Sequence, residues 1–161
     1  MRAAERAIEA VRNKYPNCTV KEICEREGIE IRRCEMGDDC DGFFVSGRGL
    51  PVIFVKKTLN YQQMREVLAH ELGHHFERVL DSMLSDRAFR DNFLSYSCRK
   101  GESEAAVFAA LLLCHDLSDC ESYHDIMRKY DCSKELAKTR MKIEQSRINE
   151  GLSHGFLEEE R

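Results

Sequence analysis

Two histidines four positions apart, with a glutamate directly after the first, form a pattern that suits metal chemistry. The segment HELGHH, residues 70–75, contains the arrangement HExxH. On a helix, residues four apart lie on one face, so the imidazoles of His70 and His74 can reach a single ion. A water bound to that ion would lie within reach of Glu71, which is the general base of this motif. The segment therefore predicts a catalytic zinc (Zn2+) site.

A catalytic zinc site usually takes three protein ligands and leaves one position for water. We expect the third ligand to be Glu104, which precedes the apolar segment 105–114. On a helix, Glu104 would share a face with Phe108 and Leu111, and a carboxylate on a buried face needs a compensating charge. A metal ion supplies that charge. The alternative is that Glu104 only stabilises the first turn of its helix through the helix dipole.

Other polar residues near the motif are weaker candidates. His75 would point about 100° away from His74, which favours a surface position or support of a ligand. His115 would share the face of Glu104 and is a candidate for orienting a ligand or stabilising an oxyanion. Glu102 would project roughly 160° away from Glu104, into solvent. The predicted site therefore consists of the metal ligands His70, His74 and Glu104 and the catalytic Glu71.

The motif lies within a segment that predicts a long amphipathic helix. Asn60 is the expected N-cap, with Gln63 at the supporting third position. His70 and His74 fall on the side opposite the apolar stripe and face either solvent or a cleft under a second layer. Apolar residues at steps of three or four form that stripe: Tyr61, Met64, Leu68, Leu72, Phe76 and Val79.

Gly73 stands in the interior of this predicted helix, where glycine costs about 1 kcal/mol relative to alanine. Such a residue predicts the close approach of another backbone or of a substrate beside the metal. The alternative is a tolerated glycine with no role.

The remaining chain predicts further helices and a small sheet. Thr19 and Glu22 form a capping box that opens a short helix ending at Gly28. The segment from Glu104 to Cys114 predicts a central buried helix, and Ser133 is the expected cap of a last helix through about Asn149. The other expected elements are a helix over 1–14, strands at 29–32, 43–45 and 51–55, a short helix and loop within 82–101, and amphipathic helix from about 119.

Composition is that of an ordinary globular domain. The chain has 161 residues, of which 42% are hydrophobic and 34% charged, and its formal net charge is −4. This length suits one domain, and the acidic balance gives no support for a nucleic-acid-binding surface. No segment approaches the roughly 20 apolar residues of a membrane span, and no export signal opens the chain. We expect a cytoplasmic protein with no membrane partner.

Eight cysteines are an unusual number for such a chain. Three pairs share a six-residue offset, which matches no common zinc spacing. Without a secreted context, reduced thiols in or near the core are the favoured interpretation, and a redox-sensing role is the alternative. The three pairs are Cys18–Cys24, Cys34–Cys40 and Cys114–Cys120.

Over residues 17–150 the order of these features resembles the ImmA/IrrE family of metallopeptidases. The resemblance rests on the helix opened at Thr19, the small sheet, VLAHELGH at 67–74, and EAAVFAALL at 104–112. It implies an α+β fold with a zincin-like core, zinc held by His70, His74 and Glu104, and Glu71 as catalytic acid and base. The best studied members of bacteria and mobile genetic elements cleave helix-turn-helix repressors, and the chain resembles the compact, ImmA-like form.

The chain departs from the family pattern in two respects. Ala106 stands where the family often has Asn or Asp, and Cys114 and His115 stand where it commonly has Pro. Neither departure affects a predicted ligand, but both affect the surroundings of the site and the choice of substrate.

We therefore expect a single domain over 1–161, with a zincin-like peptidase core at 15–118 and a C-terminal helical extension at 119–161. The expected function is zinc-dependent cleavage of a helix-turn-helix repressor, which would make the protein an anti-repressor. One alternative is a metal-binding anti-repressor that sequesters its partner without cutting it. Another is a DNA-binding regulator that uses its C-terminal helices, which the acidic charge disfavours.

Overall fold

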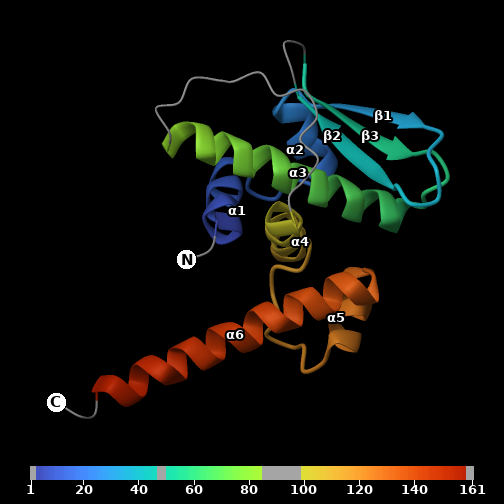
Figure 1. The fold of residues 1–161 in the computed structure, drawn as a ribbon. Coiled ribbons are helices and arrows are strands. Elements are labelled where there is room, and N and C mark those ends of the chain that lie inside the picture. The colour runs from blue at the N-terminus through green and yellow to red at the C-terminus, as the bar shows by residue number, and fades with distance from the viewer. Residues whose placement is uncertain (1–2, 47–49, 85–98, 159–161) are drawn as a thin grey trace.

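A computed structural model describes residues 3–46, 50–84 and 99–158, and this part of the chain contains six helices and one three-stranded sheet (Figure 1). The α+β class is confirmed for these residues. In chain order the elements are α1 (Ala3–Lys14), α2 (Val20–Arg26), β1 (Glu30–Cys34), β2 (Gly42–Val45), β3 (Val52–Lys56), α3 (Tyr61–Leu84), α4 (Arg99–Leu113), α5 (Tyr123–Tyr130) and α6 (Lys134–Glu158).

The predicted starts of α2 and α3 are confirmed by their caps. Thr19 and Glu22 form the expected capping box at α2. Before α3, Asn60 Oδ1 accepts from the Gln63 amide at 2.9 Å, and Gln63 Oε1 accepts from the Asn60 amide at 3.0 Å. Gly28 follows α2 with φ of 69°, the left-handed conformation that favours glycine after a helix.

Two helix limits differ from the prediction. Helix α4 already begins at Arg99 rather than near Glu104, and α6 continues to Glu158 rather than ending near Asn149. The glycines near the end of α6 weaken a helix without stopping it, because no proline follows them. Of the short helix and loop expected within 82–101, residues 85–98 lie outside the described part.

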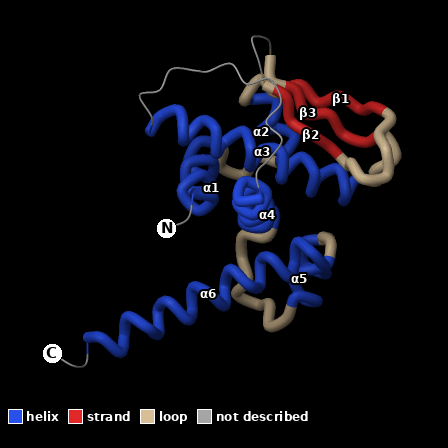
Figure 2. Tube along the Cα trace, viewed as in Figure 1, coloured by secondary structure: helices blue, strands red, loops and turns tan. Residues whose placement is uncertain are grey.

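The sheet has the strand order β1-β3-β2, with β1 parallel and β2 antiparallel to the central β3 (Figure 2). Alternation along β3 gives the sheet one covered face, since Ile53 and Val55 are fully buried. On the other face, the rings of Phe43 and Phe54 stack with centroids 4.9 Å apart. The sheet thus contributes a single layer to the core.

Helix α3 lies between this sheet and the helices α1 and α4 (Figure 1). From its apolar stripe Leu68, Leu72 and Phe76 are buried, as predicted. Tyr61 is an exception, because it is 69% exposed at the first position of α3, outside the helix layers. The side chain of Val79, the last residue of the predicted stripe, lies outside the described ones.

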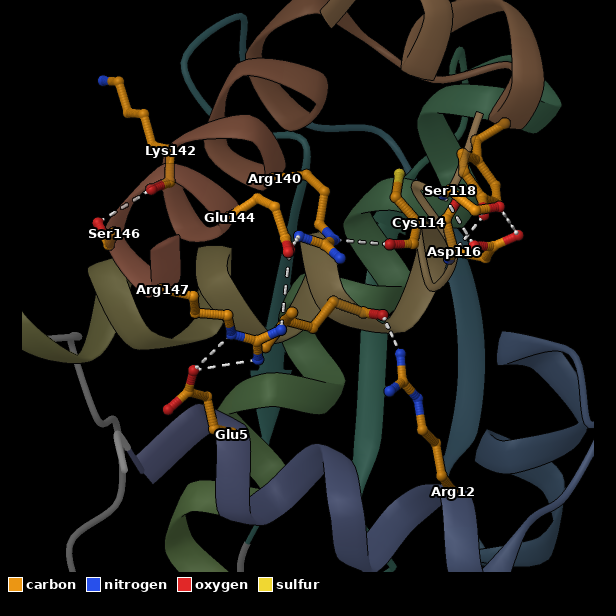
Figure 3. A network of polar contacts seen from close by, with 12 residues as sticks. Glu5, Arg12, Cys114, Asp116, Ser118, Arg140, Lys142, Glu144, Ser146 and Arg147 are labelled. Carbon is orange, nitrogen blue, oxygen red and sulfur yellow. Dashed lines mark hydrogen bonds and ion pairs between the residues drawn. The ribbon is translucent and has the colours of Figure 1, made fainter. Parts of the chain in front are cut away.

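The C-terminal end of α4 is held by arginines from two other helices (Figure 3). Arg12 of α1 donates to the Leu111 carbonyl at 2.8 Å, and Arg140 of α6 donates to the Cys114 carbonyl at 2.7 Å. The last carbonyls of a helix have no partner within it and carry partial negative charge. Both guanidinium groups therefore satisfy α4 and fix α1 and α6 against it.

The turn between α5 and α6 is held by two consecutive residues of α3. Arg65 donates to the carbonyls of Tyr130 and Asp131 at 2.5 and 2.7 Å. Glu66 accepts from the backbone amide and the hydroxyl of Ser133, both at 2.6 Å. A positive group at the end of α5 and a negative group at the start of α6 complement the two helix dipoles. Ser133 also caps α6, as predicted, by accepting from the Leu136 amide.

Helices α3 and α4 cross at Gly73. A Cβ atom on Gly73 would lie 2.9 Å from the Ala105 Cα and 3.1 Å from its Cβ. Real Cβ contacts are not that short, so only glycine allows the two backbones this close. The predicted close approach of another backbone at Gly73 is confirmed, and the approaching backbone is that of α4.

We expect Gly73→Ala to destabilise the protein by about 1–2 kcal/mol, because overpacking at the crossing outweighs the gain in helix propensity. Urea unfolding followed by circular dichroism measures the difference. Gly37→Ala is the control, since no atom lies within 4 Å of its added Cβ. A Gly73→Ala protein at least as stable as the wild type would contradict the tight crossing.

Candidate metal centre

The two motif histidines lie side by side on α3. Their ring centroids are 5.0 Å apart and the ring planes meet at 81°. Both side chains are half-buried, while Glu71 between them is only 8% exposed. The helical repeat produces this arrangement directly, since it brings positions 70 and 74 to one face. Two nitrogen ligands and a nearby sheltered carboxylate are thus present on one helix.

Glu104 is half-buried near the start of α4, one residue before the crossing with Gly73. Its Oε2 accepts a hydrogen bond from the Ala4 backbone amide at 3.0 Å. Ala4 lies in the first turn of α1, where amides have no partner within the helix. Glu104 therefore caps α1 across 100 positions of sequence. This contact had no signal in the sequence, because Ala4 belongs to no motif.

The structure brings together two of the three predicted ligands. Among residues 3–46, 50–84 and 99–158, no group of three or more His, Cys, Asp or Glu side chains is arranged to hold a metal ion. His70 and His74 form a pair, and Glu104 is directed to the amide of Ala4. The role of Glu104 as the third ligand stays a prediction. The side chain of Glu102 lies outside the described ones.

His75 is buried to a similar degree but belongs to a different cluster. Its Nε2 lies 3.2 Å from Glu27 Oε2, and its ring meets Phe44 edge-on with centroids 5.5 Å apart. Glu27 also accepts from Lys14 at 2.8 Å and from the Tyr15 hydroxyl. Burial acts to raise the pKa of Glu27, but these three hydrogen bonds outweigh it and lower that pKa.

This cluster joins the ends of α1 and α2 to the middle of α3 and so fixes the helix next to His74. Sequence reasoning missed Glu27, since its three partners are 12 or more positions away. His115 lies beyond the end of α4, is exposed, and contacts the ring of Tyr130 with centroids 5.4 Å apart. Nothing in these contacts assigns His115 to the metal centre.

Residues 24–142 match the IrrE N-terminal-like domain, Peptidase_M78. The chain belongs to the ImmA/IrrE family. The match covers more than half of the chain and includes His70, Glu71, His74 and Glu104. A comparison with curated proteins gives no match. Membership of the ImmA/IrrE family implies a metallopeptidase domain that works with a metal ion.

The motif helix of this ImmA/IrrE chain carries side chains of the types that bind metal ions. Imidazole nitrogens and a carboxylate are common zinc ligands, and a catalytic site leaves one position open. The paired imidazoles of His70 and His74 fit this requirement for two positions. In the part of the chain that the structure describes, no helix is both long and apolar enough to cross a membrane.

Glu104→Gln separates the two roles of Glu104, because the amide oxygen still accepts from Ala4 while the negative charge is lost. We expect zinc affinity to fall by at least about 10–100-fold. That is the loss typical when a residue that only hydrogen-bonds to a metal ligand is replaced. Competition with a fluorescent zinc chelator measures the affinity. Stability against urea should change little, whereas Glu104→Ala loses the α1 cap as well, at about 1 kcal/mol.

Glu135→Gln, an exposed carboxylate at the start of α6, is the matched control. Wild-type zinc affinity in Glu104→Gln would show that Glu104 serves only as the cap of α1.

Proposed function

We propose that the chain is a zinc-dependent endopeptidase whose site lies on α3. The observation that carries this proposal is the pairing of His70 and His74 on one helix face, with the sheltered Glu71 beside them. Family membership supports it, because the matched domain is that of a metallopeptidase. In the proposal His70, His74 and Glu104 hold the metal.

When bound, zinc acts as a Lewis acid toward water and the scissile carbonyl. Glu71 takes the proton from the attacking water and returns it to the nitrogen of the leaving amine. Its low exposure suits this task, since bulk water has little access to the carboxylate. The α3–α4 crossing at Gly73 brings the helix of the base and the helix of Glu104 together. In the proposal the Ala4 amide holds Glu104 Oε2, and Oε1 is the oxygen that binds the metal.

The proposed substrate is a helix-turn-helix repressor, which makes the protein a cytoplasmic anti-repressor. The net charge of −4 supports a protein partner over direct contact with DNA. Cleavage of the repressor would relieve repression. A repressor encoded next to this chain is the first candidate to test.

A second function is favoured by one observation. One carboxylate oxygen of Glu104 is engaged by the Ala4 amide. If Glu104 serves only as this cap, the chain holds a metal ion through the two imidazoles and sequesters a repressor without cutting it. It would form a complex with the intact partner, and Glu71→Gln would leave that complex unchanged.

We expect Glu71→Gln to lower the rate of repressor cleavage by about 10²–10⁴-fold, because the amide cannot accept the proton. The purified chain and the neighbouring repressor are incubated with zinc, and products are followed by gel electrophoresis and mass spectrometry. Circular dichroism and zinc binding of the variant should match the wild type. A chelator should stop wild-type cleavage, and added zinc should restore it.

Retained cleavage by Glu71→Gln would rule out the proposed base. If no fragment forms with the wild type but the intact repressor co-elutes with it in size-exclusion chromatography, the sequestering function is correct. Glu135→Gln is again the matched control and should cleave at the wild-type rate.

A further inference from the structure

Two buried cysteines meet at the end of α4. Cys114 directly follows that helix, and Cys132 lies in the turn between α5 and α6. Their sulfurs are 3.9 Å apart, although the residues are 18 positions apart in sequence. Cys114 is fully buried and Cys132 is 3% exposed. The two thiols are therefore in contact, and of the two only Cys132 retains any exposure to solvent.

Hydrogen bonds of the backbone hold both cysteines in place. The Cys114 amide donates to the Ala110 carbonyl at 3.0 Å, and the Cys114 carbonyl accepts from Arg140 (Figure 3). The Cys132 amide donates to the Met127 carbonyl at 3.3 Å. The next residue, Ser133, is held by Glu66 of α3. The backbone at both cysteines is thus fixed by the surrounding helices.

The two thiols differ in their readiness to lose a proton. Cys114 donates its S–H to the sulfur of Cys132, which lowers the pKa of Cys132 and raises that of Cys114. At Cys132 this hydrogen bond outweighs burial and the negative charges of Glu66 and Asp131, which act to raise the pKa, while the positive charge of Arg65 acts to lower it. By contrast, burial raises the pKa of the solitary Cys24 to about 12.

From this geometry we infer that Cys114 and Cys132 form a redox modification site, in which a hydroperoxide converts the dithiol into a disulfide between α4 and the α5–α6 turn. The sulfurs must approach from 3.9 Å to the about 2.05 Å of a disulfide. Rotation of the two side chains supplies this movement. The inference does not depend on peptidase activity.

The reaction is balanced with hydrogen peroxide as the oxidant. The Cys132 thiolate attacks one peroxide oxygen and the O–O bond breaks, which gives a sulfenic acid and hydroxide. The proton that Cys132 released converts this hydroxide into water. The Cys114 sulfur then attacks the Cys132 sulfur, the S–OH bond breaks, and the hydroxide leaves as water with the Cys114 proton. Two thiols lose two electrons in total, and the peroxide is reduced to two waters.

Oxidation would join the helix that carries Glu104 to the turn that Arg65 and Glu66 hold. The bond would close a loop of 18 positions, which restricts the unfolded chain. We expect the midpoint of thermal unfolding to rise by about 6–12 °C in the oxidised protein, and the rise to reverse with dithiothreitol.

Peptide mapping tests the site directly. The reduced, folded full chain is treated with hydrogen peroxide, free thiols are alkylated, and the protein is digested with trypsin without reduction. Cleavage after Lys129 and Lys134 isolates Cys132 in the peptide 130–134, while Cys114 shares the peptide 101–128 with Cys120. The expected product is a cross-link of these two peptides that forms before any other pair of cysteines.

Matched variants identify the sulfurs. Cys120→Ser should retain the cross-link and the thermal shift, whereas Cys132→Ala should lose both. The mapping on the wild type stands by itself if a variant fails to fold. The proposal is overturned if the partly exposed cysteines cross-link first, if Cys120→Ser abolishes the product, or if the cross-link forms only after unfolding in denaturant.

Discussion

The contact between Gly73 and Ala105 is the constraint on which the rest of the structure depends. Because no side chain stands between them, α3 and α4 approach at backbone distance. Phe76 and Phe108 then stack just beside the crossing, with centroids 5.7 Å apart. Any larger residue at position 73 would push the helices apart and increase the separation between the histidine pair and the helix of Glu104.

Helix α3 has three structural roles. Its first turns hold the α5–α6 turn through Arg65 and Glu66, and its middle carries the histidine pair. The face opposite the histidines packs into the core. A single rigid element fixes the spacing of the residues with these roles, because the rise and turn of a helix are constant. Interactions at the α5–α6 turn therefore act on the same element that presents the proposed catalytic groups.

Features encoded by neighbouring residues were predictable from the sequence. The caps of α2 and α3, the pairing of His70 with His74 and the tight approach at Gly73 all follow from short spacings. Tyr61 was misassigned because periodicity does not show where the core ends. Partners far apart along the chain gave no signal. These pairs are Ala4 with Glu104, Glu27 with His75, and Cys114 with Cys132.

Helix α1 is hydrogen-bonded to α4 near both ends of that helix. The Ala4 amide donates to Glu104 near the start of α4, and Arg12 donates to the Leu111 carbonyl near its end. These two hydrogen bonds oppose sliding or rotation of α4 against α1. Yet α1 lies before the family match, which begins at residue 24. A fragment trimmed to residues 24–142 would lack the Ala4 amide that holds Glu104, so the matched region is smaller than the unit that positions this carboxylate.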